Sequence, residues 1–299
     1  MTATPLDLAA YRRRIGLDGD APPTLATLAR LLDLHASAIA FENIDVLAGR
    51  IPSLDIDALE RKLVRRPRGG YCFEQNVLFR AALRALGFEV AGLEARARAG
   101  VPGDALTGRT HMALRVRVDG RDWLADVGFG GLAPTTPVAL AEGHVARDRV
   151  ARYRVSAADA DLMLQVRTGD AWNDLYRIVP SQPEDVDYEV GNWYVATHPQ
   201  AMLRNNLLMG IATPAGRLTL LNRTLTQRTA DRIHQSTLRT RADFGRVLAD
   251  DFRLGVDPSE LDAVMAIVER HDGEATSAPA LTTPRAAVGP TGPAPAPHA

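Results

Sequence analysis

Apolar residues in the first part of the chain recur at the spacing of amphipathic helices. Behind Thr24, leucines return every three or four residues, and a second run of this kind follows Asp55. Threonine and aspartate are both frequent caps of helix N-termini. A third apolar run begins at Phe73 and stops at Gly87. The pattern therefore predicts that residues 1–89 are helical.

Beyond residue 89 the pattern changes to the alternation that is typical of strands. Leu93, Ala95 and Ala97 alternate with charged residues. Four further short runs are predicted strands: 111–118, 121–127, 161–167 and 174–179. The middle of the chain, within residues 90–196, is therefore predicted to be a β region.

The last third of the chain mixes both patterns. Helical spacing returns after Pro183, two strand-like runs lie near 217–228, and amphipathic stretches follow, so residues 197–273 are predicted to be α/β. Residues 274–299 are mostly Pro, Ala, Thr and Gly. A segment without large apolar residues cannot offset the entropy cost of its own ordering. We therefore expect a disordered tail there.

Composition and charge exclude several classes of protein. The chain has 299 residues, 46% of them apolar, which suffices for a sizeable core. Its 35 basic and 36 acidic residues leave a net charge of −1, so no global field attracts nucleic acid or an anionic membrane. No apolar run approaches the length of a spanning helix, and the N-terminus lacks the apolar centre of a signal peptide. These features predict a cytoplasmic protein with small-molecule partners.

Candidate chemistry begins at the only cysteine, Cys72, in the segment RGGYCFEQN of residues 68–76. A lone cysteine can form neither an internal disulfide nor a multi-thiolate metal site, so it is either a buried small hydrophobe or a reactive thiol. The helix predicted from Phe73 places Cys72 at a helix N-terminus. Backbone N–H groups there favour a thiolate, which predicts a lowered pKa and a nucleophilic sulfur.

A nucleophilic cysteine needs a base and a group that orients it, and a predicted hairpin offers both. Asp119-Gly120 is a two-residue turn signal between the runs 111–118 and 121–127. In the resulting register His111 and Asp126 are diagonal neighbours on one face of the two strands, with their backbones roughly 7–8 Å apart. We therefore expect an imidazole–carboxylate pair. A bulged three-residue turn would shift the register by one residue and place His111 and Asp126 on opposite faces.

At this point the sequence resembles a known family. RGGYCFEQN, then THMALRV at 110–116, then DVGFGG at 126–131 are closely similar, in order and spacing, to signatures of the arylamine N-acetyltransferases. AFENID at 40–45 matches a fourth signature, and the resemblance covers residues 8–270. It implies an α+β fold with an N-terminal helical bundle, a central β-barrel ending in an interdomain helix, and a C-terminal α/β lid.

The resemblance also implies roles for individual residues. Cys72 would accept the acyl group, His111 would be its imidazole partner, and Asp126 would orient the imidazole. The implied reaction is acetyl transfer from acetyl-CoA to an arylamine, arylhydroxylamine or arylhydrazine through an acetyl-cysteine, without a metal or a permanently bound cofactor. The backbone N–H of Cys72 is a candidate oxyanion donor.

Three further positions are candidates for binding the amine. In the family, aromatic residues at the FENID and VGFG positions line the amine pocket, which implies Phe41 and Phe129; either side chain could instead be core filling. Leu203 stands where many members carry a third aromatic residue, so the amine preference is expected to differ.

A local basic cluster is open to two interpretations. It comprises Arg61, Lys62, Arg65, Arg66 and Arg68. The cluster could meet CoA phosphates, but a run of this kind is more often a solvated helix face. For Arg68 we favour a structural pair with Glu42.

Three other functions stay open from the sequence. An amide synthase of the same fold would use the same triad to release a carrier-bound chain. A thiol hydrolase of the papain or transglutaminase type shares the Cys, His and Asp logic. A binding module would leave the triad unused.

Overall fold

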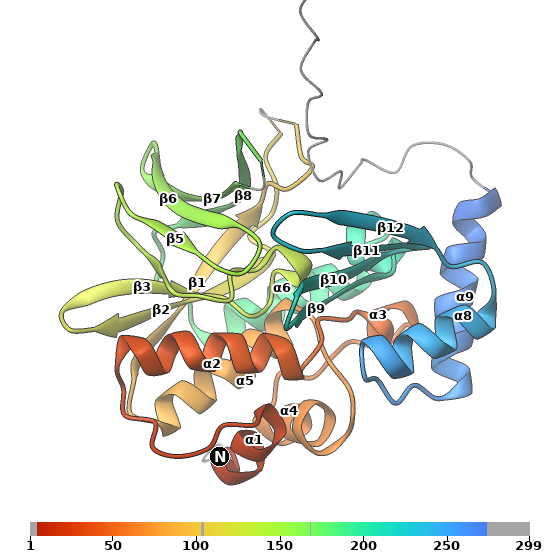
Figure 1. The fold of residues 1–299 in the computed structure, drawn as a ribbon, viewed down its shortest axis with the longest axis horizontal. Helices are drawn as coiled ribbons and strands as arrows, with labels where there is room; N and C mark the ends of the chain where they lie inside the picture. Colours follow the sequence, from red (N-terminus) through yellow and green to blue (C-terminus); the bar gives the residue numbers. More distant parts are fainter. Residues whose placement is uncertain (1–4, 103–104, 168, 274–299) are drawn as a thin grey trace, which may run out of the picture.

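The computed structural model describes residues 5–102, 105–167 and 169–273. The N-terminal part is helical, as predicted (Figure 1). Its helices are α1 (Leu8–Ile15), α2 (Leu25–Ala38), α3 (Ile44–Leu47), α4 (Ile56–Leu59) continued by the π-helical turn η1 (Glu60–Arg65), and α5 (Cys72–Ala85). Thr24 caps α2, where its side chain accepts from the backbone N–H of Thr27, and Asp55 is the N-cap of α4. The predicted helix starts are therefore confirmed.

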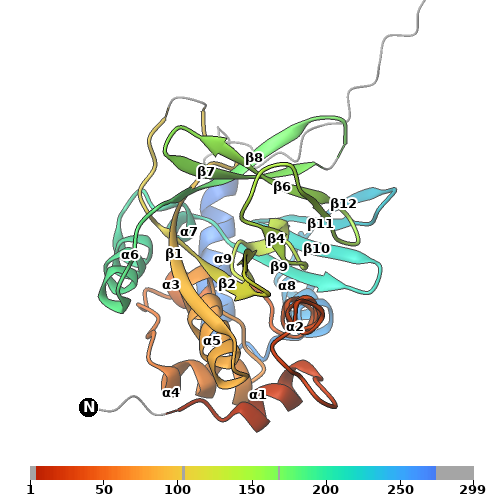
Figure 2. The ribbon, with the colours of Figure 1, turned by 90° about the vertical axis from the view of Figure 1, so that its left-hand side faces the viewer.

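An eight-stranded antiparallel sheet follows, in the order β4-β3-β2-β1-β8-β7-β6-β5. Its strands are β1 (Glu89–Ala97), β2 (His111–Val118), β3 (Arg121–Ala125), β4 (Val138–Ala139), β5 (Val145–Arg147), β6 (Arg152–Ala158), β7 (Asp161–Arg167) and β8 (Trp172–Val179), with the 3₁₀ turn η2 (Gly130–Leu132) after β3. The edge strand β4 also approaches β5 and β6, so the sheet curls into a nearly closed barrel (Figure 2).

The C-terminal part is mixed, as the pattern predicts. Its helices are α6 (Asp185–Thr197), α7 (Met202–Asn205), α8 (Arg241–Arg246) with the turn η3 (Val247–Asp251), and α9 (Pro258–Gly273). Its strands form a separate antiparallel sheet in the order β12-β11-β10-β9, from β9 (Leu208–Thr213), β10 (Gly216–Leu221), β11 (Thr224–Arg228) and β12 (Ile233–Thr237). The predicted α+β architecture of bundle, barrel and lid is confirmed.

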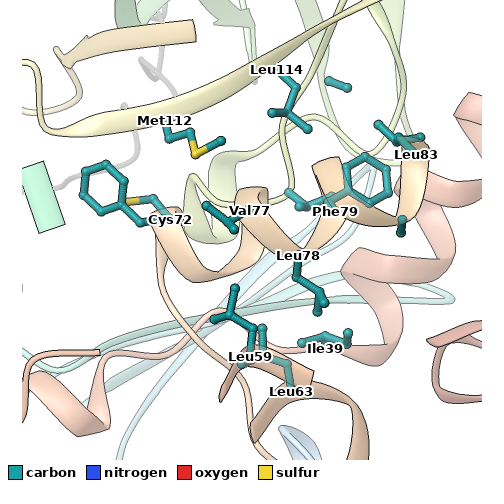
Figure 3. Close-up of a cluster of buried hydrophobic side chains, with 14 of the residues drawn as sticks. Ile39, Leu59, Leu63, Cys72, Val77, Leu78, Phe79, Leu83, Met112 and Leu114 are labelled. Atoms are coloured by element: carbon teal, nitrogen blue, oxygen red, sulfur yellow. The ribbon is translucent and has the colours of Figure 1, made fainter. Parts of the chain in front are cut away.

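Helix α5 lies at the centre of the main core. One side of it, with Val77 and Phe79, faces Met112 and Leu114 of β2, while Leu78 points toward the N-terminal helices (Figure 3). Eleven of its fourteen residues are buried. A helix enclosed on nearly all sides is held rigidly, so its first residue, Cys72, has a fixed position.

A short extended segment joins the three parts of the chain at this helix. Phe41 forms a parallel bridge with Gly70, in the loop before Cys72, and an antiparallel bridge with Gly210 of β9. Asn43 extends the connection, because its side chain donates to the carbonyls of Leu203 and Asn206. The C-terminal sheet is therefore hydrogen-bonded to the segment that precedes the nucleophile.

The structure differs from the pattern at several strands. Five strands lie outside the predicted runs: β4, β5, β6, β9 and β12. In addition, β3 ends at Ala125 instead of residue 127. All five residues of β12 are exposed, so it has no apolar alternation to detect and is held by backbone pairing with β11. The predicted boundaries at 89, 196 and 273 stay predictions, and the predicted tail, 274–299, lies outside the described residues.

Candidate active site

Cys72 is the first residue of α5, where the sequence places it. The Glu74 carboxylate accepts a hydrogen bond from the backbone N–H of Tyr71 at 3.1 Å and so fixes the start of the helix. The N–H of Cys72 has no acceptor within its own helix, since the first four N–H groups of any helix lack one. This leaves a backbone donor beside the sulfur.

The sulfur of Cys72 lies against the start of β2. Its thiol donates to the carbonyl oxygen of Thr110 at 3.8 Å, and it accepts from the backbone N–H groups of Phe73 and Met112. Thr110 and Met112 are the residues on either side of His111. The sulfur therefore contacts the backbone on both sides of His111.

The β2–β3 hairpin has the predicted register. Val118 pairs with Arg121 and Leu114 pairs with Ala125. Asp119 and Gly120 both have positive φ, at 50° and 73°, which is the geometry of a type I′ turn. The ladder ends at Ala125, and just beyond it Oδ2 of Asp126 lies 2.8 Å from Nε2 of His111. The expected imidazole–carboxylate pair is present.

Asp126 is held by more than His111. Its Oδ1 accepts from Asn76 Nδ2 at 2.9 Å and from the backbone N–H of Gly128 at 2.7 Å. The carboxylate is fully buried, and burial alone would raise its pKa; the charge and hydrogen bond of His111, followed by the other two donors, hold the pKa below its ordinary value. An ionised Asp126 is acceptor-only, so Nε2 of His111 donates the hydrogen bond between them.

The electrostatics of Cys72 correct the sequence-based expectation. Burial raises the pKa of the Cys72 thiol, and the Asp126 charge adds to this, whereas the N–H groups of Phe73 and Met112 lower it. The helix start therefore does not produce a thiolate by itself. In so buried a position a thiolate needs a positive partner, and a protonated His111 would supply it.

Aromatic rings surround the imidazole. The rings of Phe129 and Tyr176 lie 4.9 and 4.8 Å from the His111 ring, centroid to centroid, and 4.9 Å from each other. Burial, and then the Asp126 charge, raises the pKa of Tyr176 well above its usual range. The phenol therefore stays neutral, and the base is enclosed by rings that exclude water.

The structure brings Phe41 to the same loop as Phe129. The Phe41 ring lies against Gly130, and Phe41, Val127 and Gly130 line a small open hollow. None of Cys72, His111 and Asp126 lines this hollow. Leu203 is half-buried in α7 and packs against the main cluster, which includes Cys72. The structure thus places Phe129 against His111, Phe41 against the loop that carries Phe129, and Leu203 on the main core cluster.

Three of the five residues of the basic cluster form ion pairs within the chain. Arg68 is buried and donates to Oε1 of Glu42 from Nε and Nη2, at 3.0 and 2.8 Å, which confirms the pair favoured from the sequence. Lys62 pairs with Asp45 and Glu74. Arg65 is exposed and pairs with Glu60 and Asp7, and the other two members, Arg61 and Arg66, are exposed as well.

Two further findings concern metals and membranes. Within the described residues, no group of three or more His, Cys, Asp or Glu side chains is arranged to hold a metal ion. In the same part of the chain, no helix is both long and apolar enough to cross a membrane.

Sequence reasoning missed three residues at the site: Asn76, Gly128 and Tyr176. Asn76 had a readable signal, because it lies four residues after Cys72 and hence on the same face of the helix. A β-carbon at Gly128 would lie 2.5 Å from Nδ2 of Asn76, so only glycine permits this approach of the loop. Tyr176 comes from β8, and nothing in its local sequence points to His111.

Comparison with known proteins gives this geometry a family. A family model described as N-acetyltransferase matches residues 24–261. The chain is 38% identical over 265 residues to an arylamine N-acetyltransferase of Mycolicibacterium smegmatis, covering 86% of this chain and 94% of that one. It belongs to the arylamine N-acetyltransferase family.

Other relatives agree. An arylamine N-acetyltransferase of Escherichia coli is 38% identical over 277 residues, covering 90% of this chain and 98% of that one. Among solved structures, the Mycobacterium marinum arylamine N-acetyltransferase in complex with CoA superposes with a TM-score of 0.84 at 35% identity, covering 88% of this chain and 99% of that one. The chain is thus an acyltransferase, and its family supports acetyl transfer to arylamines.

Proposed function

We propose that this protein transfers an acetyl group from acetyl-CoA to the nitrogen of an arylamine, arylhydroxylamine or arylhydrazine through an acetyl group on Cys72. The observation that carries the proposal is the 2.8 Å contact between His111 Nε2 and Asp126 Oδ2. The Cys72 sulfur lies beside this pair, against the backbone of the residues that flank His111. CoA is bound by the Mycobacterium marinum relative, which supports acetyl-CoA as the donor here.

In the first half-reaction the thiol proton of Cys72 passes to Nδ1 of His111. The sulfur attacks the thioester carbonyl, the new C–S bond forms, and the C–S bond to CoA breaks. The departing CoA thiolate takes the proton from His111. The ionised Asp126 stabilises the transient imidazolium, and the N–H of Cys72 is the candidate donor to the developing oxyanion.

In the second half-reaction the amine nitrogen attacks the acetyl carbonyl on Cys72. The bond from carbon to the Cys72 sulfur breaks, and the amine proton passes through His111 to regenerate the thiol. Phe41 and Phe129 would contact the aromatic ring of the amine, and the rings of Phe129 and Tyr176, which enclose the imidazole, would shield the acetyl-cysteine from water. Leu203 is a third candidate contact.

The decisive experiment is the intact mass of the protein after mixing with acetyl-CoA alone. We expect the gain of one acetyl group, mapped to Cys72 by peptide analysis, and no gain for Cys72→Ser. Adding an arylamine should remove the group and release the N-acetylated amine. A protein that stays unmodified, or that cleaves a peptide without acyl-CoA, would favour a binding module or a thiol hydrolase instead. Acylation only from a carrier-bound chain would favour an amide synthase.

A further inference from the structure

Six of the nine large hydrophobic side chains that the described residues leave exposed gather around α6. Four lie on the helix itself: Val186 (59% exposed), Val190 (64%), Trp193 (57%) and Tyr194 (41%). Met202 of α7 follows the helix, whereas Ile51 precedes Pro52, whose carbonyl accepts from Asn192 on the buried side of α6. We call Val186, Val190, Trp193, Tyr194 and Met202 the α6 patch. Exposed apolar patches of a few hundred Å² are often functional.

The opposite side of α6 packs against the rest of the molecule. Gly191 faces Phe73 of α5, and Asn192 accepts from the hydroxyl of Tyr71. Tyr188 packs against Gly92 of β1. The helix is therefore seated rigidly, with its exposed face directed away from the molecule (Figure 2). No described residue covers that face.

The exposed face has the spacing of a helix–helix seam. Three apolar side chains, Val186, Val190 and Trp193, are separated by four and three positions, which is the spacing of one heptad. Tryptophan, tyrosine and methionine are also the residues enriched where proteins bind each other. A second helix is thus the shape that fits this surface.

The charges around the patch are arranged for self-association. The N-terminal half of α6 and its N-cap expose Glu184, Asp187 and Glu189, while Asp185 pairs with Arg80 of the same chain. At its other end Arg204 donates to the carbonyl of Thr197, so a cation lies against the C-terminus. In an antiparallel pair each acidic end meets the Arg204 of the other copy, whereas a parallel pair would bring acid against acid. The acidic end also disfavours an anionic membrane.

We propose that two copies of this chain associate through antiparallel packing of α6 on α6, with Val190 and Trp193 of one copy against Trp193 and Val190 of the other. The self-complementary charge pattern is what a two-fold interface requires. At these exposures, the patch presents roughly 400 Å² of surface per copy, hence at most roughly 800 Å² in a pair, which is the size of weak, transient interfaces. The dimer should therefore be weak and reversible.

Sedimentation velocity of the full chain from about 1 µM to 1 mM tests this directly. We expect a monomer–dimer equilibrium that weakens with salt, because the paired ends are charged. Val190→Glu should raise the dissociation constant at least tenfold while acetyl transfer and thermal stability stay unchanged. Val145→Glu is the matched control, since Val145 is 57% exposed on β5 and should leave the equilibrium unchanged. Trp193→Ser should act like Val190→Glu.

Several outcomes would overturn the proposal. These are a monomer at every concentration, an unchanged dimer in both α6 variants, or an equal effect of Val145→Glu. Binding of monomeric protein to phosphatidylcholine vesicles through Trp193 would assign the patch to lipid instead. Arg204→Glu should also weaken the dimer severalfold; an unchanged constant would reject the antiparallel arrangement.

Discussion

Gly128 packs so closely against the first turn of α5 that a β-carbon at this position would lie 2.8 Å from the Cα atom of Cys72. Its backbone N–H also donates to Oδ1 of Asp126. One residue thus touches the proposed nucleophile and the carboxylate that orients the proposed base. The distance between these two groups depends on the absence of a side chain at 128.

Gly128→Ala should therefore impair catalysis strongly. The new methyl group would meet backbone atoms of Cys72, which cannot move aside as a flexible side chain could. Displacements of about 1 Å in a catalytic arrangement cost about 100-fold in rate, so we expect the acetylation rate of Cys72 to fall by about 10- to 100-fold. Rapid-quench measurement of acetyl-enzyme formation checks this.

Gly169→Ala is the control, because nothing lies within 4 Å of a β-carbon at that position. It should leave the acetylation rate at the wild-type value. If Gly128→Ala acetylates as fast as Gly169→Ala, the loop and the helix start are not coupled as the packing indicates.

Asn76→Ala should weaken the support of Asp126. The Asn76 amide donates to Asp126 Oδ1 and to the carbonyl of Met112, and its own oxygen accepts from the N–H of Val127. Losing a partner that orients a functional group costs about 10- to 100-fold in comparable sites. We expect a decrease of that order in acetylation rate, and a larger decrease for Asp126→Asn, which disturbs the His111 tautomer directly.

The pH profile of Cys72 alkylation separates this effect from simple destabilisation. Both variants should slow alkylation by iodoacetamide at neutral pH, because a less well oriented His111 holds the thiolate less effectively. Asn173→Ala, on β8, should alkylate at the wild-type rate. If the alkylation rate is unchanged in both Asn76→Ala and Asp126→Asn, the Asp126 carboxylate does not influence the ionisation of the Cys72 thiol.

The site could be predicted from the sequence wherever local rules decide it. The turn signal at Asp119-Gly120 fixed the register that brings His111 to Asp126, and the helix pattern placed Cys72 at the start of α5. Contacts between distant segments could not be read in this way. The ring of Tyr176 reaches His111 only because β8 pairs with β1, which in turn pairs with β2.

The direction in which the pKa of Cys72 is shifted could not be predicted from the local sequence either. The helix start is a local feature, whereas burial depends on how β2 packs over α5, and burial has the larger effect. The strand at 208–213 was similarly missed: it is buried for most of its length, and its apolar run does not alternate. Its place is decided by the bridge from Gly210 to Phe41.

His35 should make the protein sensitive to acid. It is fully buried in α2, where Nδ1 lies 2.8 Å from the Tyr11 hydroxyl and Nε2 lies 2.7 Å from Oε1 of Gln75. Burial lowers the pKa of His35 to about 4, below its ordinary value of 6.5. Because the unfolded chain binds this proton more readily, the neutral imidazole stabilises the fold above pH 6.5, and this contribution is lost as the pH falls from 6.5 toward 4.

Between pH 7.5 and pH 5 the loss should amount to about 2 kcal/mol in the free energy of unfolding, because pH 5 lies about 1.5 units below the ordinary pKa of 6.5. Urea unfolding at these two pH values measures it. His35→Gln can keep neutral hydrogen bonds to Tyr11 and Gln75 without titrating, so its stability should change less between the two pH values. An equal change in wild type and His35→Gln would assign the acid sensitivity to other groups.

Leu203→Phe tests the third candidate contact with the amine. The Leu203 carbonyl accepts from Asn43, two residues after Phe41, so the structure holds α7 near the segment that carries Phe41. If Leu203 lines the amine pocket, the added ring should lower KM severalfold for small one-ring amines, because aromatic pairs contribute about 0.5–1.5 kcal/mol beyond area burial. For two-ring amines it should raise KM, since the new ring takes their space.

The acetylation half-reaction separates this role from the alternatives. The amine is absent from that step, so Leu203→Phe should acetylate Cys72 from acetyl-CoA at the wild-type rate. Leu203→Met, which keeps an aliphatic side chain of similar volume, is the control and should leave KM for both amine classes nearly unchanged. Equal shifts for one-ring and two-ring amines would make Leu203 a packing residue of the main cluster. Slowed acetylation with unchanged KM would place it on the path of the acetyl donor instead.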